Sequence, residues 1–352
     1  MTARSCSVIL FLCLVSFAFV SCRDKGGTAV IERGIYYWKS SEDSFDSTEI
    51  NAVKTLEVKK MYVKYFEVEY DNVFGARPTS KSPINFRYAD NAAILQAIEI
   101  IPVVFIKNEV LKNTAPADID SLAGNILFLA DKRYKEQMLY NEGFAELQID
   151  CDWTASTKDK YFALLKYLKK ASGKTISCTL RMYPYKYPEL MGVPPVDKVT
   201  LMCYNLNNPL EHENKNSILD VAELKKYLDT KKQYPLHLDI VLPINSWMLC
   251  FKNNQFAGVL HNREIINNIA IPVKPLWYVV TRDTLVDDMF IRQGDMIKYE
   301  EAKEEELQAV ARLLKSKLNL EKKTTISFFH LDKTSLNKYS HETLGGLYNS
   351  FK

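Results

Sequence analysis

The stretch that decides the fold is ELQIDCDWTAS, residues 146–156, in which an apolar run ends in two aspartates and an amphipathic segment follows. Side chains two residues apart on a β-strand face the same way, so Asp150 and Asp152 would point to one side at the strand's carboxyl end. In a barrel of parallel strands, that end carries the active site. Two carboxylates held close together cannot both ionise freely, and such pairs are typical of acid–base and glycosyl-transfer sites.

The rest of the chain repeats this alternation of a short apolar run and an amphipathic segment. The predicted strands are Gly34–Trp38, Lys60–Val68, Ile101–Ile106, Ala145–Cys151, Thr175–Met182, Lys198–Tyr204, Leu236–Ile244 and Thr324–Leu331. Eight is the number of strands in a closed α/β barrel, the (β/α)8 TIM barrel. The alternative, an open doubly wound sheet, is disfavoured because no glycine-rich phosphate loop follows the first strand.

Helix starts and one insertion complete the predicted organisation. Asp46, Ser156 and Asp220 each precede an acidic residue by three positions, which is typical of a capped first turn. The segment at about 251–299 separates the seventh strand from its helix and contains hairpin-like runs. It predicts an inserted β-rich segment that builds a wall beside the barrel mouth. No internal repeat or linker divides residues 31–352, which we expect to form one domain.

The N-terminus has the features of a processing segment. Arg4 is followed by an apolar run, Val8–Val20, that is too short to span a bilayer and ends beside Cys22. A small residue directly before a cysteine is the pattern in which the cysteine becomes lipidated. Residues 1–21 are therefore predicted to be a lipoprotein signal peptide, and residues 22–30 a polar tether. This predicts a lipid-anchored protein of the bacterial cell envelope, in the outer membrane; the alternative is an ordinary signal peptide with a chance cysteine.

Composition excludes several classes of function. The chain of 352 residues has 46 basic and 43 acidic residues, a balance that argues against a nucleic-acid partner. No CxxC pair or metal-ligand spacing is present, so we expect no metal and no cofactor. Four cysteines lie in or beside apolar runs and are predicted to be small buried residues: Cys151, Cys178, Cys203 and Cys250. The sequence gives no signal for an oligomeric state.

The candidate site consists of the side chains at the carboxyl ends of the predicted strands. The catalytic candidates are Asp150, Asp152 and Tyr204, and the ligand-binding candidates are Trp38, Glu67, Trp153, Arg181, Asn205, Trp247 and His330. Carboxylates and amides recognise hydroxyl groups, and aromatic faces stack on the apolar face of a sugar ring. This mixture predicts a carbohydrate ligand.

Several candidates also have a purely structural interpretation. Glu67 and its neighbour Glu69 could be solvated or pair with Lys64. Arg181 could simply neutralise the two aspartates inside the barrel. The two tryptophans, Trp153 and Trp247, could be hydrophobic lids, and His330 could be a satisfied core histidine. The two aspartates are the exception, because acids on one face of a buried strand are costly to keep without a purpose.

The runs DCDWT and LMCYN resemble reduced forms of the signatures of family 18 glycoside hydrolases, D-x-x-D-x-D-x-E and M-x-Y-D. The resemblance implies that Asp152 orients the substrate acetamide and that Tyr204 supports the intermediate. Thr154 stands where the family has its general acid, and Asn205 where it has an aspartate. The chain from the second strand to the eighth also resembles a family of uncharacterised bacterial lipoproteins with a glycosidase-like barrel. The segments that carry it are KYFEVEYD, QIDCDWTASTKDKYFALL, TISCTLRMY, LMCYN, LPINSWMLCFKNNQFAGVL and ISFFHLDKTSLNKY.

Two hypotheses follow. The first is a hydrolase of glycosidic bonds in which Asp152 or Asp150 acts as the acid–base, with Glu67 or Glu69 as a more distant carboxyl. Asp152 is the simpler candidate, because it lies one strand step before the missing glutamate. The second is a non-catalytic, lipid-anchored glycan-binding or scaffold protein. Losing a general acid typically lowers the rate by about 10²–10⁴-fold, and a threonine cannot replace it.

Overall fold

The computed structural model describes residues 30–40, 45–87, 92, 98–138, 143–211, 213–230, 232–260, 266–320 and 323–352. Eight parallel strands close into a barrel, because β1 pairs with β16 on one side and with β2 on the other. The strands are β1 (Val30–Tyr37), β2 (Lys60–Asp71), β4 (Glu99–Ile106), β5 (Glu146–Asp150), β6 (Thr175–Leu180), β7 (Lys198–Met202), β8 (His237–Pro243) and β16 (Lys323–Phe329). The predicted TIM barrel is confirmed, and every predicted strand is present.

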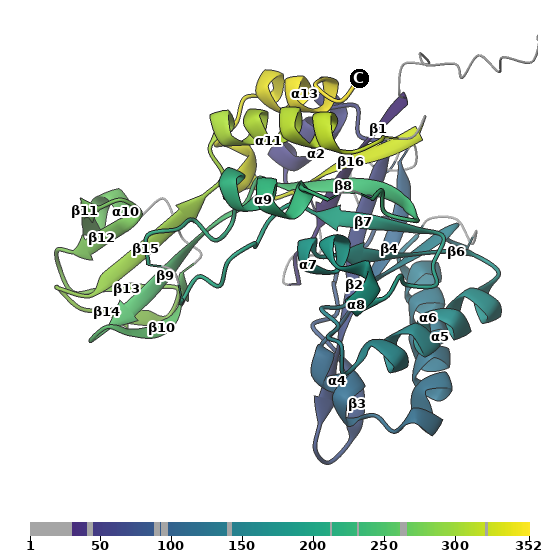
Figure 1. The fold of residues 1–352 in the computed structure, drawn as a ribbon. Coiled ribbons are helices and arrows are strands. Elements are labelled where there is room, and N and C mark those ends of the chain that lie inside the picture. The colour runs from purple at the N-terminus through teal and green to yellow at the C-terminus, as the bar shows by residue number, and fades with distance from the viewer. Residues whose placement is uncertain are drawn as a thin grey trace, which may run out of the picture.

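Helices cover the outside of the barrel (Figure 1). The longer ones are α2 (Ser47–Thr55), α5 (Ile119–Gln137), α6 (Lys158–Ser172), α9 (Val221–Leu228), α11 (Glu304–Lys317) and α13 (His341–Asn349). Asp46 and Asp220 cap their helices as predicted, each accepting a backbone N–H with its side chain. The cap predicted at Ser156 is wrong, because α6 starts after Thr157, whose hydroxyl instead donates to Asn108 Oδ1 at 2.7 Å.

Shorter elements fill the connections. They are β3 (Gly75–Thr79), which pairs with the end of β2, together with α4 (Asn108–Asn113), η1 (Pro116–Asp118), α7 (Met182–Lys186), α8 (Pro188–Met191) and α12 (Lys333–Leu336). A parallel crossover normally carries a full helix. Between β6 and β7, however, the chain forms only α7 and α8, of five and four residues. The outer faces of these two strands therefore lack the long helix that covers most of the others.

The β-rich insertion after the seventh strand forms a sheet that stands away from the barrel, and we call residues 246–301 the arm (Figure 1). Its strands are β9 (Ser246–Lys252), β10 (Gln255–Leu260), β11 (Ala270–Lys274), β12 (Trp277–Val280) and β15 (Met296–Glu301), in the antiparallel order β10-β9-β15-β12-β11. The hairpin of β13 (Thr284–Val286) and β14 (Met289–Ile291) and the short α10 (Ile266–Ile269) complete it. The arm has its own apolar cluster around Met248, Cys250 and Ile297.

A buried ion pair lies at the base of the arm. Lys298 and Glu300 are both fully buried and lie 2.8 Å apart. Glu300 also accepts hydrogen bonds from the indole N–H of Trp247, at 2.6 Å, and from the backbone N–H of Ser217, at 3.1 Å. Because Ser217 belongs to the connection after β7, these contacts tie the arm to the barrel.

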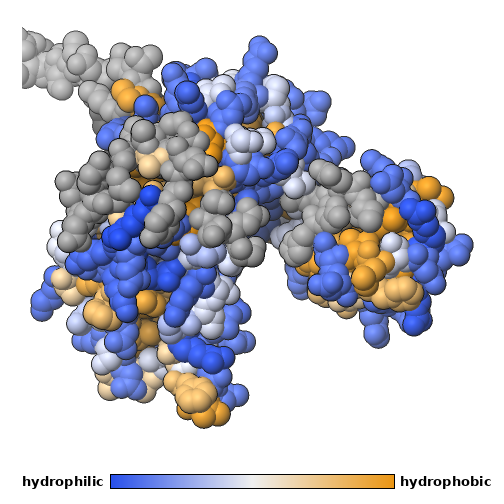
Figure 2. All heavy atoms as spheres, turned by 180° about the vertical axis from the view of Figure 1, so that it is seen from behind, coloured by the Kyte–Doolittle hydropathy of each residue, from blue (hydrophilic) through white to orange (hydrophobic). Residues whose placement is uncertain are grey.

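The outer surface of the arm is partly apolar. Figure 2 shows hydrophobic surface gathered on the arm when the molecule is seen from behind. The exposed apolar side chains in this region are Phe256, Ile271, Val273, Leu285 and Phe290. The arm therefore buries one cluster and leaves a second set of apolar side chains at its edges.

The cysteines behave as predicted from their apolar surroundings. Cys151, Cys178, Cys203 and Cys250 are all buried and carry free thiols. Within the described ranges, no helix is both long and apolar enough to cross a bilayer. The predicted signal peptide and Cys22 lie outside the described residues, as does most of the predicted tether.

Candidate active site at the barrel mouth

The floor of the barrel interior is a buried ion cluster. Lys198 Nζ lies 2.8 Å from Glu146 Oε2 and 3.0 Å from Asp239 Oδ2, and all three side chains are largely buried. Burial acts to raise the pKa of Asp239, but the hydrogen bond from His237 and the charge of Lys198 lower it to about 2. One lysine is thus shared by two carboxylates in this cluster, which occupies the layer of the barrel furthest from the mouth.

Above the floor lies a layer of hydrogen-bonded side chains. The hydroxyl of Tyr36 donates to Gln148 Oε1 at 2.7 Å, and the amide of Gln148 donates to Thr200 Oγ1 at 3.0 Å. The ring of Tyr36 stacks on that of Tyr62 with centroids 4.7 Å apart. These bonds fill the barrel and leave the side chains of the next layer to face the mouth.

Asp150 ends β5 in the layer above. Its side chain is 8% exposed and accepts a hydrogen bond from Thr179 Oγ1 at 2.5 Å. Burial and then the neighbouring charge of Asp152 raise the pKa of Asp150 from 3.8 to about 6, against the lowering effects of Thr179 and Arg181. Asp150 can therefore hold or release a proton near neutral pH.

Asp152 lies one strand step further out and has a different environment. Its side chain is 51% exposed, and Oδ1 lies 2.9 Å from Nε of Arg181. The guanidinium group thus pairs with the outer aspartate, and its charge also acts on the inner one. The two carboxyl groups are close enough to interact and are held in different environments, which is how paired acids acquire separate roles.

Tyr204 completes the group that we call the mouth cluster: Asp150, Asp152, Arg181 and Tyr204. The tyrosine is buried, and its ring stacks on Phe329 at 5.3 Å. Burial, followed by Tyr36 and Asp150, raises the pKa of the Tyr204 hydroxyl well above its ordinary value, and Arg181 and Asp152 also act on it. The four side chains therefore lie close enough to act on one another at one end of the barrel, whereas the single cleft and the roles predicted for them stay a prediction.

Trp38 and Glu67 lie at the same end. Glu67 pairs with Lys64 at 2.6 Å, as the structural interpretation predicted, and its charge adds to the raised pKa of Asp150. Lys64 Nζ lies 5.6 Å from the centre of the Trp38 ring. Residues three apart on a regular strand face opposite ways, but the register of β2 shifts between Lys64 and Phe66. This bulge brings Lys64 and Glu67 to the same side.

Three further residues end neighbouring strands, and two of them, Asn205 and His330, were predicted. Asn205, after β7, adopts φ 52°, and its amide oxygen is buried without a hydrogen-bond partner among the described residues. The amide oxygen of Asn245, which follows β8, is in the same state. His330 follows β16, and its Nε2 lies 3.4 Å from Asp332 Oδ2. The two amide oxygens are acceptors that a ligand's hydroxyl or N–H group could satisfy.

The structure gives both predicted tryptophans contacts outside the mouth cluster. Trp153 is buried among the helices, stacks on Tyr161 at 5.1 Å and donates its indole N–H to the carbonyl of Met191 at 3.3 Å. It has the parity of Cys151, so it points opposite to Asp150 and Asp152. The indole N–H of Trp247 is occupied by Glu300 at the base of the arm. Among the described residues, no group of three or more His, Cys, Asp or Glu side chains could hold a metal ion.

Two solved bacterial enzymes share this architecture. The spore cortex-lytic enzyme SleL of Bacillus cereus matches with a TM-score of 0.53 and 16% identity, over 93% of this chain and 75% of that one. A chitinase of Chromobacterium violaceum matches with a TM-score of 0.51 and 11% identity, over 92% of this chain and 99% of that one. The chain shares the barrel fold of these two enzymes. No protein-family model matches the chain, and no curated protein is similar to it in sequence.

Within this glycosidase-like barrel, position 154 departs from the family 18 pattern. Thr154 is exposed in the turn before α6, and its hydroxyl lies 2.9 Å from that of Ser156. The residues that the sequence analysis missed as site partners are Gln148 and Thr179. Alternation along their strands could have found them, because each lies two residues before a side chain that faces the mouth, Asp150 and Arg181.

Proposed function

We propose that the chain is a lipid-anchored protein of the bacterial cell envelope that binds a carbohydrate at the barrel mouth and hydrolyses a glycosidic bond there. Asp150 gives a proton to the leaving glycosidic oxygen as the bond from the anomeric carbon breaks, and water completes the hydrolysis. Asp152, held by Arg181, remains a carboxylate that faces the developing positive charge. The hydroxyl of Tyr204 supports the transition state.

The observation that carries this proposal is the raised pKa of Asp150, about 6, beside a second aspartate paired with an arginine. A general acid works best when its pKa lies near the working pH, and glycosidases use a buried carboxyl for this role. Because Thr154 has no carboxyl group, Asp150 takes the place of the missing acid. Asp150 is favoured over Asp152, whose exposed side chain is already paired with a cation.

The alternative function is glycan binding without turnover. It is favoured by a specific observation, namely that the position of the family's acid holds a threonine whose hydroxyl is shared with Ser156. Under this alternative, the mouth cluster binds the sugar and catalyses no reaction. Under either function, the amide oxygens of Asn205 and Asn245, which lack hydrogen-bond partners among the described residues, are available to accept hydrogen bonds from the sugar.

A screen of the purified protein without its lipid is expected to find a saccharide that binds at the mouth and is cleaved. Chito-oligosaccharides and peptidoglycan fragments are suitable probes, because the fold neighbours are a chitinase and a spore cortex-lytic enzyme. Affinity is measured by calorimetry and products by mass spectrometry. Turnover that falls as the pH rises above about 6 supports an acid with the pKa of Asp150. Tight binding without products supports the alternative.

Replacing Cys22 by Ser is expected to release the protein from the membrane fraction. A lipid on this cysteine would be the anchor, because the preceding apolar run is too short to span a bilayer. The measurement is fractionation of cells that express either form, followed by immunodetection. A matched control is Cys13→Ser, which removes a cysteine inside the apolar run. If the Cys22 variant stays with the membrane, the lipoprotein assignment is wrong.

A further inference from the structure

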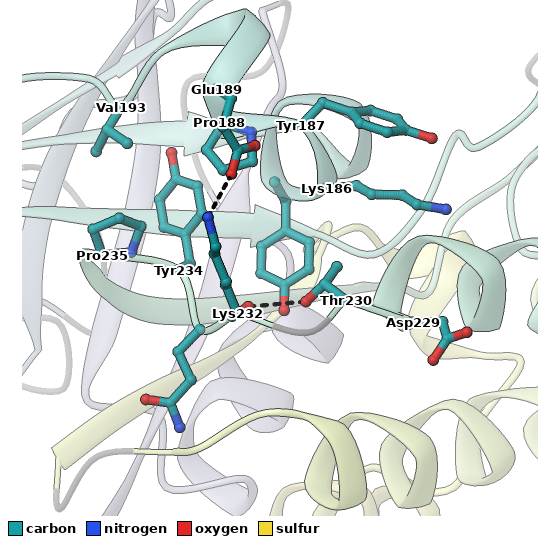
Figure 3. A pocket seen from close by; sticks show the side chains of 12 residues that line it. Lys186, Tyr187, Pro188, Glu189, Val193, Asp229, Thr230, Lys232, Tyr234 and Pro235 are labelled. Carbon is teal, nitrogen blue, oxygen red and sulfur yellow. Dashed lines mark hydrogen bonds and ion pairs between the residues drawn. The ribbon is translucent and has the colours of Figure 1, made fainter.

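A groove runs along the flank of the barrel where the helix between β6 and β7 is missing. One wall is the segment 185–193, which contains α8 and the end of α7, and the other is the segment 229–235, which leads from α9 into β8. The space between these walls has a volume of about 500 Å³, within the range of ligand sites. We call it the flank groove (Figure 3).

Aromatic rings and prolines form much of the groove. Tyr185 and Tyr234 come from opposite walls and stack with centroids 5.7 Å apart. Tyr187 also lines the groove and is 40% exposed, with its ring tilted against that of Tyr183 at 4.8 Å. Pro188 and Pro235 add rigid apolar surface beside the rings (Figure 3). Such surfaces match the C–H faces of a sugar ring.

The described lining of the groove has no excess charge. It contains two lysines, Lys186 and Lys232, and two acids, Glu189 and Asp229. Lys232 Nζ lies 3.3 Å from Glu189 Oε1 across the groove, and both side chains are exposed (Figure 3). An exposed ion pair of this kind is weak, so hydroxyl groups can compete for its donors and acceptors. The balance favours a neutral, hydrogen-bonding ligand over an anionic one.

Tyr234 provides an independent indication of a ligand. Its side chain is only 8% exposed, yet its buried hydroxyl has no hydrogen-bond partner among the described residues. Buried tyrosine hydroxyls normally have a partner. Because this oxygen is itself buried, a water held beneath the ligand would satisfy it.

We propose that the flank groove is a second carbohydrate site, which holds a neutral glycan chain apart from the barrel mouth. The choice of a glycan rests on the proposed function, since a protein that processes a polymer gains from a second attachment point. The wall of the groove begins in the helix that directly follows Arg181, a member of the mouth cluster. Occupation of the groove can thus favour binding of the same polymer at the mouth through an increased local concentration.

The test uses Tyr187→Ala, which removes the exposed ring, and Tyr234→Phe, which removes the unpartnered hydroxyl. The matched control is Phe128→Ala, because Phe128 is an exposed aromatic residue on α5. The probes are chitohexaose, cellohexaose and mannohexaose. We expect Tyr187→Ala to weaken binding of at least one hexasaccharide about tenfold, the loss expected when an aromatic anchor is truncated. Phe128→Ala should bind as the wild type does.

Hydrogen exchange separates the groove from the mouth. In an Asp150→Asn protein, the bound hexasaccharide should still protect the amides of segments 185–193 and 229–235. If these segments are not protected by any of the hexasaccharides, or if Tyr187→Ala binds as the wild type does, the second site is wrong. If only a proline-rich peptide protects them, the groove is a peptide site and the glycan proposal is wrong. Protection of the groove by a hexasaccharide that the wild type neither binds at the mouth nor cleaves would leave the second site standing and would overturn the proposed function.

Discussion

Replacing Asp150 by Asn is expected to lower kcat/KM by about 10²–10⁴-fold, the usual contribution of a general acid. The substitution keeps the shape of the side chain and the acceptor for Thr179, which donates at 2.5 Å, so ligand affinity should change little. The measurement is steady-state turnover of a saccharide that the wild type cleaves, with calorimetric affinities in parallel. Equal activity of both proteins would show that another group supplies the proton, with Asp152 and Glu67 the next candidates.

The same substitution is expected to raise stability at high pH. The folded pKa of Asp150 is about 6, whereas its ordinary value is 3.8, so the folded state holds this proton more tightly than the unfolded chain does. The resulting stabilisation is fully present below about pH 4 and is lost as the pH rises through 6. A shift of this size corresponds to about 3 kcal/mol. Asn carries no charge, so the variant avoids that loss.

Urea unfolding at pH 4 and at pH 8 measures this effect. We expect the Asp150→Asn variant to match the wild type at pH 4 and to exceed it by up to about 3 kcal/mol at pH 8. Asp152→Asn is the control, because that side chain is half exposed and its pair with Arg181 contributes about 1 kcal/mol or less. If the wild type is as stable as Asp150→Asn at pH 8, folding does not raise the pKa of Asp150. This result does not depend on finding a substrate.

Replacing Glu300 by Ala is expected to lower the free energy of unfolding by about 3–5 kcal/mol, the loss typical of a broken buried ion pair. The change leaves Lys298 fully buried without its carboxylate and also removes the acceptor for the Trp247 indole and the Ser217 backbone N–H. Because these contacts join the arm to the barrel, the amides of the arm should exchange faster. The measurement is urea unfolding combined with hydrogen exchange.

Glu213→Ala is the matched control for this variant. Glu213 is exposed and pairs with Lys274 of the arm at 3.4 Å, a surface contact worth about 1 kcal/mol at most. If Glu300→Ala proves too unstable to isolate, Glu300→Gln keeps the volume and tests the charge alone. Losses of similar size in Glu300→Gln and Glu213→Ala would contradict the proposed role of the buried pair.

Alternation and chain order made the barrel predictable, and the same alternation placed the mouth cluster. Asp150, Asp152, Arg181 and Tyr204 each follow an apolar strand, and residues two apart share a face whatever the rest of the fold does. The start of β1 was harder to find. The strand begins at Val30, four residues before the predicted start at Gly34. The prediction started too late because the polar residues Glu32 and Arg33 interrupt the apolar pattern. Both side chains are held by ion pairs at the end of the barrel, which no pattern reveals.

The parts of the site that the sequence did not predict depend on irregular backbone and on contacts between distant segments. The bulge that turns Lys64 and Glu67 to one side follows from a local change of register, and β-bulges have no strong sequence signature here. Trp153 was placed beside the aspartates, although its parity is opposite to theirs. The flank groove follows from the absence of a long helix after β6, which periodicity alone does not indicate, because α7 and α8 are too short to show a repeat.

The pairing of the first and last strands of the arm has an evolutionary consequence. Ser246 and Glu301 are register partners in β9 and β15, so the chain leaves the barrel and comes back to it at neighbouring positions. Because its two ends are adjacent, such an insertion can change in length or be replaced during evolution while the spacing of the barrel strands stays the same. Selection could therefore change the arm without altering the strands that hold Asp150 and Asp152.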